Sequence, residues 1–493
     1  MAELPEIRVH SCNDRDPDPR GDHLLYWMIG ARRARHSFAL DRAVALAEAM
    51  EKPLVILEPL RSDYRWASDR HHRFILDGMA DNQARFSGQP VTYYPYVEPE
   101  RGAGKGLFSA LAEKAAAVVT DDYPAFFLPR MVKAAAARCP VRMERVDGNG
   151  LLPIHGGDKR FTTARSFRYH LQRTIAGALD ARPESDPFAK KRLPDPWSIP
   201  GSITKRWPMA SAALLAGDPK ALARLPIDHG VPVSPVRGGA VAAEAALDLF
   251  LGKKLGLYPE ERNHPDSDAA SGLSPYLHYG HVSVHAIFEA LMRKAGWTKD
   301  KLSSKVTGQR EGFWGAPPEV EAFLDELVTW REVGFHECAV NADYDRYESL
   351  PSWALATLDK HRGDRREVVY SLDQLDASET HDEIWNAAQR QLVREGRMHN
   401  YLRMLWGKKI LEWSKTPEEA LSRLIELNNK YALDGRDPNS YSGIFWVLGR
   451  YDRAWGPERE IFGTVRYMSS DSTRRKLHLA AYLKRFGPPR KGP

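Results

Sequence analysis

Short apolar runs alternate with longer amphipathic runs in the first third of the chain. The amphipathic runs have helical spacing and begin near residues 37, 68, 106 and 126. The short runs, most of them apolar, have the length and residue types of β-strands: LLYWMIG (24–30), PLVILEPL (53–60), VTYYPYV (91–97), AAVVTDD (116–122) and VRMERVD (141–147). Strands separated by helices of this length predict parallel pairing with right-handed crossovers. The sequence therefore predicts an open α/β sheet here, in a domain over residues 1–180.

The pattern changes after this domain. Residues 181–235 are rich in Pro, Ser, Asp and Lys, which predicts a long linker over the surface. Residues 236–493 keep a helical pattern and predict an all-α domain. Two segments have the spacing of helix capping boxes, Thr380-His-Asp-Glu383 and Thr416-Pro-Glu-Glu419. Three glycines stand where helices should stop: Gly296, Gly334 and Gly396.

Composition excludes several classes of protein. With 43% apolar and 28% charged residues, the chain should fold as a globular protein. It has no stretch of about 18 apolar residues and no apolar leader segment, so we expect neither a membrane span nor secretion. The cysteines are too few and too widely spaced for a disulfide framework or a CxxC site, at Cys12, Cys139 and Cys338. We therefore expect a cytoplasmic protein, and no metal centre.

Charge and glycine motifs add little by themselves. The 71 Lys and Arg residues exceed the 65 Asp and Glu residues, and the net charge of +6 is compatible with a polyanionic partner such as DNA. The predicted first strand is not followed by GxGxxG. The run RGAGKG (101–106) lacks the Ser or Thr that ends a P-loop, so we expect it to be an ordinary loop.

Three tryptophans in the helical region suggest redox chemistry. Trp406 and Trp413 lie seven residues apart in one helical run, and Trp385 lies in the run before it. Seven residues bring two indoles to the same helix face, about 10 Å apart along the axis. With Trp385 packed across the helix pair, the rings could relay an electron from the surface to a buried cofactor. Large aromatic residues at this spacing more often simply fill cores, and the pattern alone favours that interpretation.

Longer runs of this sequence resemble class II cyclobutane pyrimidine dimer photolyases, which belong to the photolyase/cryptochrome family. The strongest are SGLSPYLHYG (271–280), HDEIWNAAQRQLVREGRMHNYLRMLWGKKILEW (381–413), LNNKYALDGRDPNSYSGIFW (427–446), YDRAWG (451–456) and RYMS (466–469). Weaker similarity occurs at LLYWM (24–28) and DKRFTTARSFR (158–168). The resemblance implies a Rossmann-like antenna domain followed by an all-helical FAD-binding catalytic domain. It also implies light-driven repair of pyrimidine dimers in DNA, by electron transfer from reduced FAD to the flipped-out lesion.

The resemblance assigns cofactor roles to individual residues. Trp406, Trp385 and Trp413 would form the photoreduction chain, with Trp406 nearest the flavin and Trp413 at the surface. Asn428 would face the flavin N5 edge and tune the flavin radical, because an amide can donate or accept a hydrogen bond. A helix starting at Ser274 would point N–H groups at the pyrophosphate. The other FAD contacts would be Tyr258, Ser271, Gly272, Leu273, Ser274, Asp434, Arg436 and Asp437.

Substrate roles follow from the same resemblance. Glu326, Trp330, Met404 and Trp446 would contact the dimer, while Asp452 and Arg453 would support the opened duplex. Two indoles can sandwich a flipped dimer, whose extrusion costs least where bases are already poorly paired. Glu326 would hydrogen-bond the lesion and stabilise charge on it, provided that its own carboxylate is protonated or neutralised. Without the resemblance, Glu326 could be the polar side of a helix, and Asp452 with Arg453 an exposed ion pair.

Two places depart from the class II pattern. His336 and Glu337 stand where an Asn-Phe pair near the flavin pocket is usual, and His285 stands where an Arg is usual. Two alternatives to repair therefore stay open: a cryptochrome-like blue-light receptor, and a light-independent nucleic-acid-binding protein on the same scaffold. We expect a monomer, and class II relatives suggest a deazaflavin as the antenna chromophore.

Overall fold

The computed structural model describes residues 4–189 and 191–488 of the protein. The chain divides into two compact units and passes between them repeatedly. The first unit consists of Met1–Gly157, Thr174–Asp248 and Leu273–Gly296, and the second of Asp158–Arg173, Leu249–Gly272 and Trp297–Pro493. These bounds follow contacts and differ from the predicted domains 1–180 and 236–493. The functional division with its linker at 181–235 stays a prediction.

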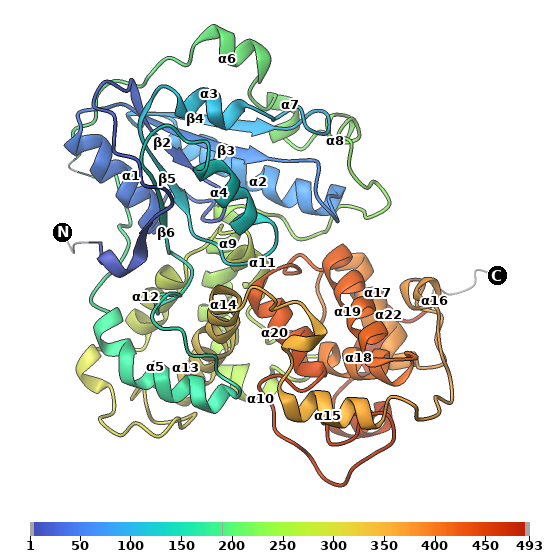
Figure 1. The fold of residues 1–493 in the computed structure, drawn as a ribbon. Helices are drawn as coiled ribbons and strands as arrows, with labels where there is room; N and C mark the ends of the chain where they lie inside the picture. Colours follow the sequence, from blue (N-terminus) through green and yellow to red (C-terminus); the bar gives the residue numbers. More distant parts are fainter. Residues whose placement is uncertain (1–3, 190, 489–493) are drawn as a thin grey trace. The chain divides into compact units, whose positions relative to one another are not determined.

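The first unit is built on a six-stranded sheet (Figure 1). Its strands are β1 (Val9–Ser11), β2 (His23–Trp27), β3 (Leu54–Leu60), β4 (Val91–Val97), β5 (Ala115–Asp121) and β6 (Met143–Val146). The order across the sheet is β1-β6-β5-β2-β3-β4, and all pairs are parallel except β1 with β6. The five predicted strands and their parallel pairing are confirmed. The prediction missed β1, because three residues, VHS, form no apolar run.

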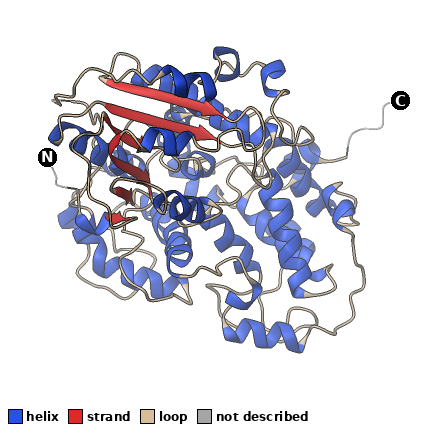
Figure 2. Cartoon of the chain, turned by 45° about the horizontal axis from the view of Figure 1, so that its top comes forward, coloured by secondary structure: helices blue, strands red, loops and turns tan. Residues whose placement is uncertain are grey.

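Helices cover both faces of this sheet, which is why β2 is buried along its whole length. Leu24 and Tyr26 point to a core with α1 (Phe38–Ala49) and the end of α2 (Asp69–Phe86). The alternate residues point to the opposite core, which is closed by α3 (Leu107–Ala112), α4 (Leu128–Ala136) and α6 (Gly201–Arg206). Figure 2 shows the strands gathered in one part of the chain, with helices beside them.

The other helices of the first unit are short or lie in its later segments. They are η1 (Glu6–Arg8), α7 (Ala212–Leu215), α8 (Pro219–Leu222), α9 (Ala240–Leu249), α11 (Ser274–His278) and α12 (Val284–Lys294). The predicted linker thus carries three short helices, α6 to α8. The RGAGKG run is a loop, as expected, and its Gly106 has φ 97° directly before α3.

Every described strand lies in the first unit, and the described part of the second unit consists of helices and loops. It begins with most of α5 (Ala164–Ala178). The helical segments that follow are η2 (Phe250–Lys254), η3 (Leu255–Leu257), α10 (Tyr258–Glu261), η4 (Lys299–Lys301), α13 (Pro318–Leu324), η5 (Asp325–Trp330), α14 (Arg331–Val340), η6 (Tyr347–Ser349), α15 (Ser352–Lys360), α16 (Leu372–Asp376), α17 (Glu383–Glu395), α18 (Asn400–Glu412), α19 (Pro417–Tyr431), α20 (Pro438–Val447), α21 (Ser470–Lys476) and α22 (Ala480–Phe486). Among the described residues, no helix is both long enough and apolar enough to cross a membrane.

The predicted helix starts are correct to within a few residues. Thr416 caps α19, and its hydroxyl accepts from the backbone N–H of Glu419 at 3.2 Å. Thr380 does not cap α17: the cap is Asp382, whose carboxylate accepts from the N–H groups of Ile384 and Trp385, both at 3.0 Å. A carboxylate two residues further on competes successfully because it satisfies two free N–H groups at once.

The predicted helix stops are correct at two of three glycines. Gly396 ends α17 with φ 73°, and Gly296 follows α12 with φ 55°. Gly334 was expected to stop a helix and instead lies inside α14. A β-carbon there would meet α20, at 2.4 Å from Ser442 Oγ and 2.7 Å from the Pro438 carbonyl oxygen. This glycine therefore allows α14 and α20 to approach closely.

We expect Gly334→Ala to lower the free energy of unfolding by about 1–3 kcal/mol, because the added methyl group overpacks this contact. Gly443→Ala is the matched control: it lies in α20, and no atom stands within 4 Å of the place its β-carbon would take. The control should be neutral or should stabilise by about 0.5–1 kcal/mol, as alanine does in a helix. Urea unfolding followed by circular dichroism measures both changes. Equal stability of the two variants would contradict the close approach.

Candidate functional site

The three tryptophans form a continuous ladder in the second unit, with Trp385 in the middle. Trp385 on α17 stacks on Trp406 of α18, with ring centroids 6.4 Å apart and planes only 7° from parallel. Trp413 at the end of α18 meets Trp385 edge-on, with centroids 5.6 Å apart and planes at 68°. The Trp385 Nε1–H donates to the Trp406 carbonyl oxygen at 3.0 Å. These contacts fix the rings in one order: Trp406, Trp385, Trp413.

Trp413 does not reach the surface itself, and that expectation is wrong: it is 3% exposed. Two rings cover it edge-on, Tyr370 at 5.2 Å and His381 at 5.3 Å. The Tyr370 hydroxyl and His381 Nδ1 lie 2.6 Å apart, and His381 is exposed. The structure thus places a hydrogen-bonded Tyr–His pair between the ladder and solvent. Sequence reasoning missed Tyr370, because the contact depends on how the segment before α17 folds back.

Asn428 is buried on α19 and is held by its amide nitrogen. Its Nδ2 donates to Ser440 Oγ at 2.8 Å and to Asn429 Oδ1 at 3.1 Å. Asn429 Oδ1 also accepts from the backbone N–H of Arg436 at 2.9 Å, which ties the segment 434–437 to α19. With the Asn428 N–H donors engaged, the amide oxygen is the atom that could accept a hydrogen bond from a cofactor.

The other predicted FAD contacts come from two stretches of the chain, residues 258–274 and residues 434–437. Tyr258 begins α10, and Ser271 and Gly272 also belong to the second unit, whereas Leu273 and Ser274 belong to the first. α11 begins at Ser274, as expected, but has only five residues. Asp434 accepts from Arg403 at 2.9 Å, Arg436 is buried with φ 65°, and Asp437 caps α20 through the Asn439 N–H at 2.8 Å.

Two observations in the second unit fit a bound polar cofactor. Gln389 Oε1 accepts from Trp406 Nε1–H at 2.9 Å, while the buried Gln389 Nε2 has no hydrogen-bond partner among the described residues. A buried amide donor without a partner is costly, so an acceptor beside Trp406 would satisfy it. Gly272 has φ 71°, and a β-carbon added to it would meet nothing within 4 Å, which leaves room for a ligand beside its backbone. The amide donor and the space fit the flavin that the resemblance implies.

Glu326 is neutralised by a neighbouring guanidinium. It lies on the π-helical segment η5, and its Oε1 accepts from Arg262 Nη1 at 2.7 Å. Burial raises the pKa of Glu326, Arg262 acts to lower it, and the Asp325 charge raises it again. Arg262 also lies over the Tyr258 ring, 5.3 Å from its centroid. The pairing meets the condition that a carboxylate must be neutralised before it can face a negatively charged substrate.

A buried ion pair holds the segment that carries Glu326 and Trp330. Arg168 of α5 makes two bonds to Asp325, from Nε at 2.8 Å and from Nη2 at 3.2 Å. Both side chains are 8% exposed. A bidentate pair of this kind fixes orientation as well as position. It therefore anchors the start of η5, one residue before Glu326.

The predicted substrate contacts share one property: each keeps part of its side chain exposed, unlike the buried ladder. This holds for Glu326, Trp330, Met404 and Trp446.

Asp452 and Arg453 do not form the exposed ion pair that was the alternative interpretation of these two residues. Asp452 pairs with Arg466 instead, at 2.9 Å and 3.3 Å, and Arg453 is exposed and lies over the Trp455 ring at 4.4 Å.

A buried lysine, which the sequence did not indicate, lies beneath Trp446. Lys408 of α18 is fully buried, its Nζ stands 4.8 Å from the Trp446 ring centroid, and it donates to the Val447 carbonyl oxygen at 2.6 Å. Burial lowers the pKa of Lys408 to about 7 from an ordinary value of 10.5. Lys408 thus supports the Trp446 ring from α18.

This pKa predicts a dependence of stability on pH. Between pH 7 and 10.5 the unfolded chain holds a proton on Lys408 that the folded chain has released. The unfolded state binds more protons in this window, so Lys408 makes the free energy of unfolding rise with pH. We expect Lys408→Met to remove this part of the rise, whereas the variant Lys476→Met, at an exposed position on α21, should keep it. Urea unfolding at several pH values measures the difference, and parallel pH profiles of native protein and Lys408→Met would contradict it.

The residues that depart from the class II pattern have structural partners. Within the second unit, His336 Nε2 and the Lys159 carbonyl oxygen lie 2.8 Å apart, and Glu337 accepts from Arg160 Nε at 3.1 Å. In the first unit, the His285 ring meets Phe38 edge-on at 5.1 Å near the start of α12. All three side chains are buried. His336 and Glu337 therefore attach α14 to residues 159–160.

The α/β unit and the helical unit with its indole ladder define the class of the protein. A solved structure, that of a bacterial class III photolyase from Agrobacterium tumefaciens, matches with a TM-score of 0.64 at 17% identity and covers 94% of this chain and 86% of that chain. That likeness shows the photolyase/cryptochrome fold. No protein-family model matches the chain.

Curated relatives narrow the class to one family. A deoxyribodipyrimidine photo-lyase of Methanothermobacter thermautotrophicus is 33% identical over 97% of this chain and 98% of its own length. Proteins of the same name from Potorous tridactylus and Arabidopsis thaliana are each 31% identical, over 94% and 93% of this chain and 81% and 88% of their own lengths. The chain belongs to the deoxyribodipyrimidine photo-lyase family.

Proposed function

We propose that this protein is a class II photolyase that repairs cyclobutane pyrimidine dimers in DNA, using light and reduced FAD. The observation that carries the proposal is the ladder Trp406–Trp385–Trp413, whose stacked and edge-on rings make an unbroken path through the second unit. Relatives that span nearly the whole chain and bear the name of this enzyme support it. FAD, when bound and reduced, supplies the electron for repair after it absorbs blue light.

The residues around the ladder would hold and reduce this cofactor. Gln389 and Asn428 would present a donor and an acceptor to the flavin, beside Trp406 and on α19 respectively. Electrons would enter from solvent by way of His381 and Tyr370, which cover Trp413. The rest of FAD would contact Tyr258, Ser271, Gly272, Leu273, Ser274, Asp434, Arg436 and Asp437.

The partly exposed residues would receive the lesion. Trp330 and Trp446 would stack on the flipped dimer, and Met404 would fill the space beside it. Glu326, neutralised by Arg262, would hydrogen-bond the lesion without repelling the added electron. Arg453 is exposed and would support the opened duplex, while Asp452 holds Arg466 in place.

The first unit would carry an antenna chromophore of the deazaflavin type. An open α/β sheet binds ligands beyond the carboxyl ends of its strands, and the parallel strands β6, β5, β2, β3 and β4 provide such an edge. An absorption band in addition to the flavin bands would identify the chromophore in purified protein. Action as a monomer in the cytoplasm stays a prediction from the sequence.

The test is repair of a synthetic oligonucleotide that contains one cyclobutane thymine dimer. Chemically reduced protein is illuminated with blue light, and absorbance from the restored base double bonds is followed. We expect recovery in the light, none in the dark, and slower recovery with Glu326→Gln. Unchanged dimer in the light would reject the proposal. A protein partner bound more tightly after illumination, with no repair, would favour a cryptochrome-like receptor, and purified protein without flavin colour would favour the light-independent scaffold.

A further inference from the structure

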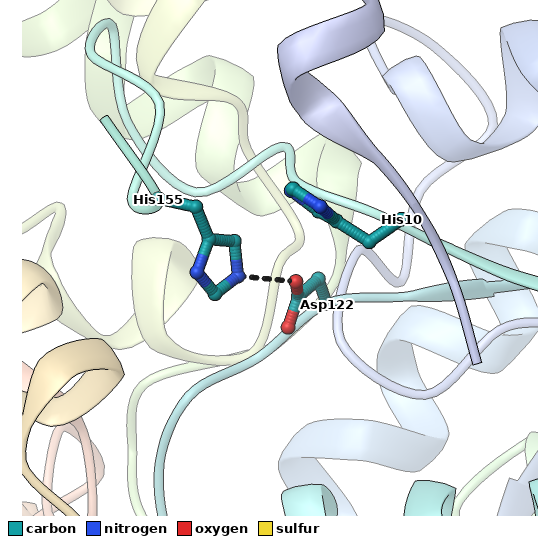
Figure 3. A group of neighbouring side chains, drawn as sticks. All are labelled: His10, Asp122 and His155. Atoms are coloured by element: carbon teal, nitrogen blue, oxygen red, sulfur yellow. Dashed lines mark hydrogen bonds and ion pairs between the residues drawn. The ribbon is translucent and has the colours of Figure 1, made fainter. Parts of the chain in front are cut away.

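Three side chains from distant parts of the first unit converge near one edge of the sheet, and none of them is among the residues assigned to repair. They are His10 on β1, Asp122 directly after β5, and His155 in the loop after β6 (Figure 3). One potential metal-ligating atom from each residue lies within 4.8 Å of the others. The His10 and His155 rings meet edge to face, with centroids 4.5 Å apart.

The fold fixes the positions of all three. In the β1–β6 ladder His10 pairs with Arg145, and the backbone N–H of Asp122 donates to the Val146 carbonyl oxygen at 3.0 Å. The loop that carries His155 is held just before it, because Asp147 accepts from the Ile154 N–H at 2.8 Å. Side chains placed by strand pairing and by an anchored loop are preorganised, as a binding site requires.

One of the three side chains has a buried nitrogen atom without a hydrogen bond. This atom is His10 Nε2, which has no hydrogen-bond partner among the described residues. A neutral imidazole with an unused nitrogen can give its lone pair to a cation. Asp122 Oδ2 lies 2.8 Å from His155 Nε2, so a carboxylate stands beside both rings.

We propose that His10, Asp122 and His155 bind one divalent transition-metal cation, such as Zn²⁺. Two imidazoles and one carboxylate form a donor set that suits Zn²⁺ and its neighbours in the first transition series, with a further position open for water. Binding replaces the His155–Asp122 hydrogen bond by two bonds to the metal. It joins β1 and the loop after β6 to the end of β5. Cysteine spacing, on which the expectation of no metal centre rested, could not reveal a site whose ligands are two histidines and an aspartate.

The positive charge of Arg145 would repel a cation bound at this site, and this repulsion allows the proposal to be tested. Arg145 Nε lies 3.4 Å from Asp122 Oδ2, and its side chain is 38% exposed, so it can turn into solvent when a metal enters. Removing its positive charge without changing a ligand should tighten metal binding. If the three side chains only packed against one another, Arg145→Gln would not change metal binding at this place. We therefore expect Arg145→Gln to bind the cation more tightly than the native protein.

The experiment uses full-length, tag-free protein with its flavin, stripped of metal by a chelator. Zn²⁺ is titrated by calorimetry, and Co²⁺ by its visible absorption. We expect one cation per chain, at least about tenfold weaker binding in His10→Ala, His155→Ala and Asp122→Asn, and a melting temperature that rises with Zn²⁺ only where the site is intact. His229→Ala is the matched control, because His229 forms a two-residue pair with Asp69 at 2.8 Å in the same unit. It should bind Zn²⁺ as the native protein does.

Two results would overturn the metal site. One is the absence of stoichiometric uptake in both native protein and Arg145→Gln. The other is binding that stays equally tight in the three ligand variants, which would place the cation elsewhere. Asp122→Asn keeps the shape of the side chain, so a folded variant is available for the comparison if a histidine substitution disturbs the sheet. Circular dichroism identifies the folded variants.

Discussion

Light-driven flavin reduction should fall by at least about tenfold in Trp385→Phe, which corresponds to about 1.4 kcal/mol on the barrier. Trp385 is the only described ring that touches both Trp406 and Trp413, at centroid distances of 6.4 Å and 5.6 Å. Phenylalanine keeps part of the packing but is much harder to oxidise than an indole. The substitution therefore interrupts electron transfer at the middle of the ladder while it leaves the fold in place.

The measurement is the rate of loss of oxidised-flavin absorbance under blue light with an external reductant. Trp297→Phe is the matched control, because Trp297 forms an indole pair with Trp314 in the second unit, outside the ladder, at 6.4 Å. It should photoreduce at the native rate. Repair by chemically reduced Trp385→Phe should also be native, since in the proposed function the ladder serves flavin reduction alone. A native photoreduction rate in Trp385→Phe would show that electrons take another route.

Arg168→Leu should destabilise the second unit by about 3–5 kcal/mol. The substitution leaves the Asp325 carboxylate buried without its bidentate partner, and breaking a buried ion pair from one side has this cost. Arg310, 3.5 Å from Asp325 and largely exposed, compensates only in part. Because Asp325 begins η5, the change should also loosen Glu326 and Trp330 and slow repair in protein that still folds.

Urea unfolding followed by tryptophan fluorescence measures this loss. Arg165→Leu is the control on the same helix, because Arg165 is exposed, and its effect should stay within about 0.5 kcal/mol. Arg168→Leu should unfold at clearly lower urea than Arg165→Leu. Coincident transitions for the two variants would show that the Arg168–Asp325 pair does not anchor η5.

The fold could be predicted from the sequence wherever one local pattern dominates. Four of the five parallel strands are mainly apolar runs, and β6, with the sequence MERV, continues the alternation of strands and helices. All five were therefore found, whereas β1 is too short to produce a pattern. Helix ends were less certain because neighbouring residues compete for the same N–H groups, and Asp382 prevailed over Thr380. Gly334 was misplaced because a glycine needed for close helix packing looks, in sequence, like one that ends a helix.

The candidate site was predictable only in part, because local spacing does not show which distant residues come into contact. Helical spacing places Trp406 and Trp413 on one face of α18, but it does not give the ring angles or the cover over Trp413. Partners distant in sequence left no signal, such as Arg168 and Asp325, which are 157 positions apart. The same applies to Lys408 beneath Trp446, because a lysine in a helical run is normally an exposed residue.

The proposed repair requires that the second unit hold a flavin in electronic contact with the tryptophan ladder, through Trp406. This requirement is tested by the absorption spectrum of purified protein during blue illumination, compared between native protein and Trp406→Phe. We expect flavin bands in both proteins, rapid bleaching of these bands in the native protein, and little bleaching in the variant. Absence of flavin bands in the native protein, or equally fast bleaching in Trp406→Phe, would contradict the proposed contact.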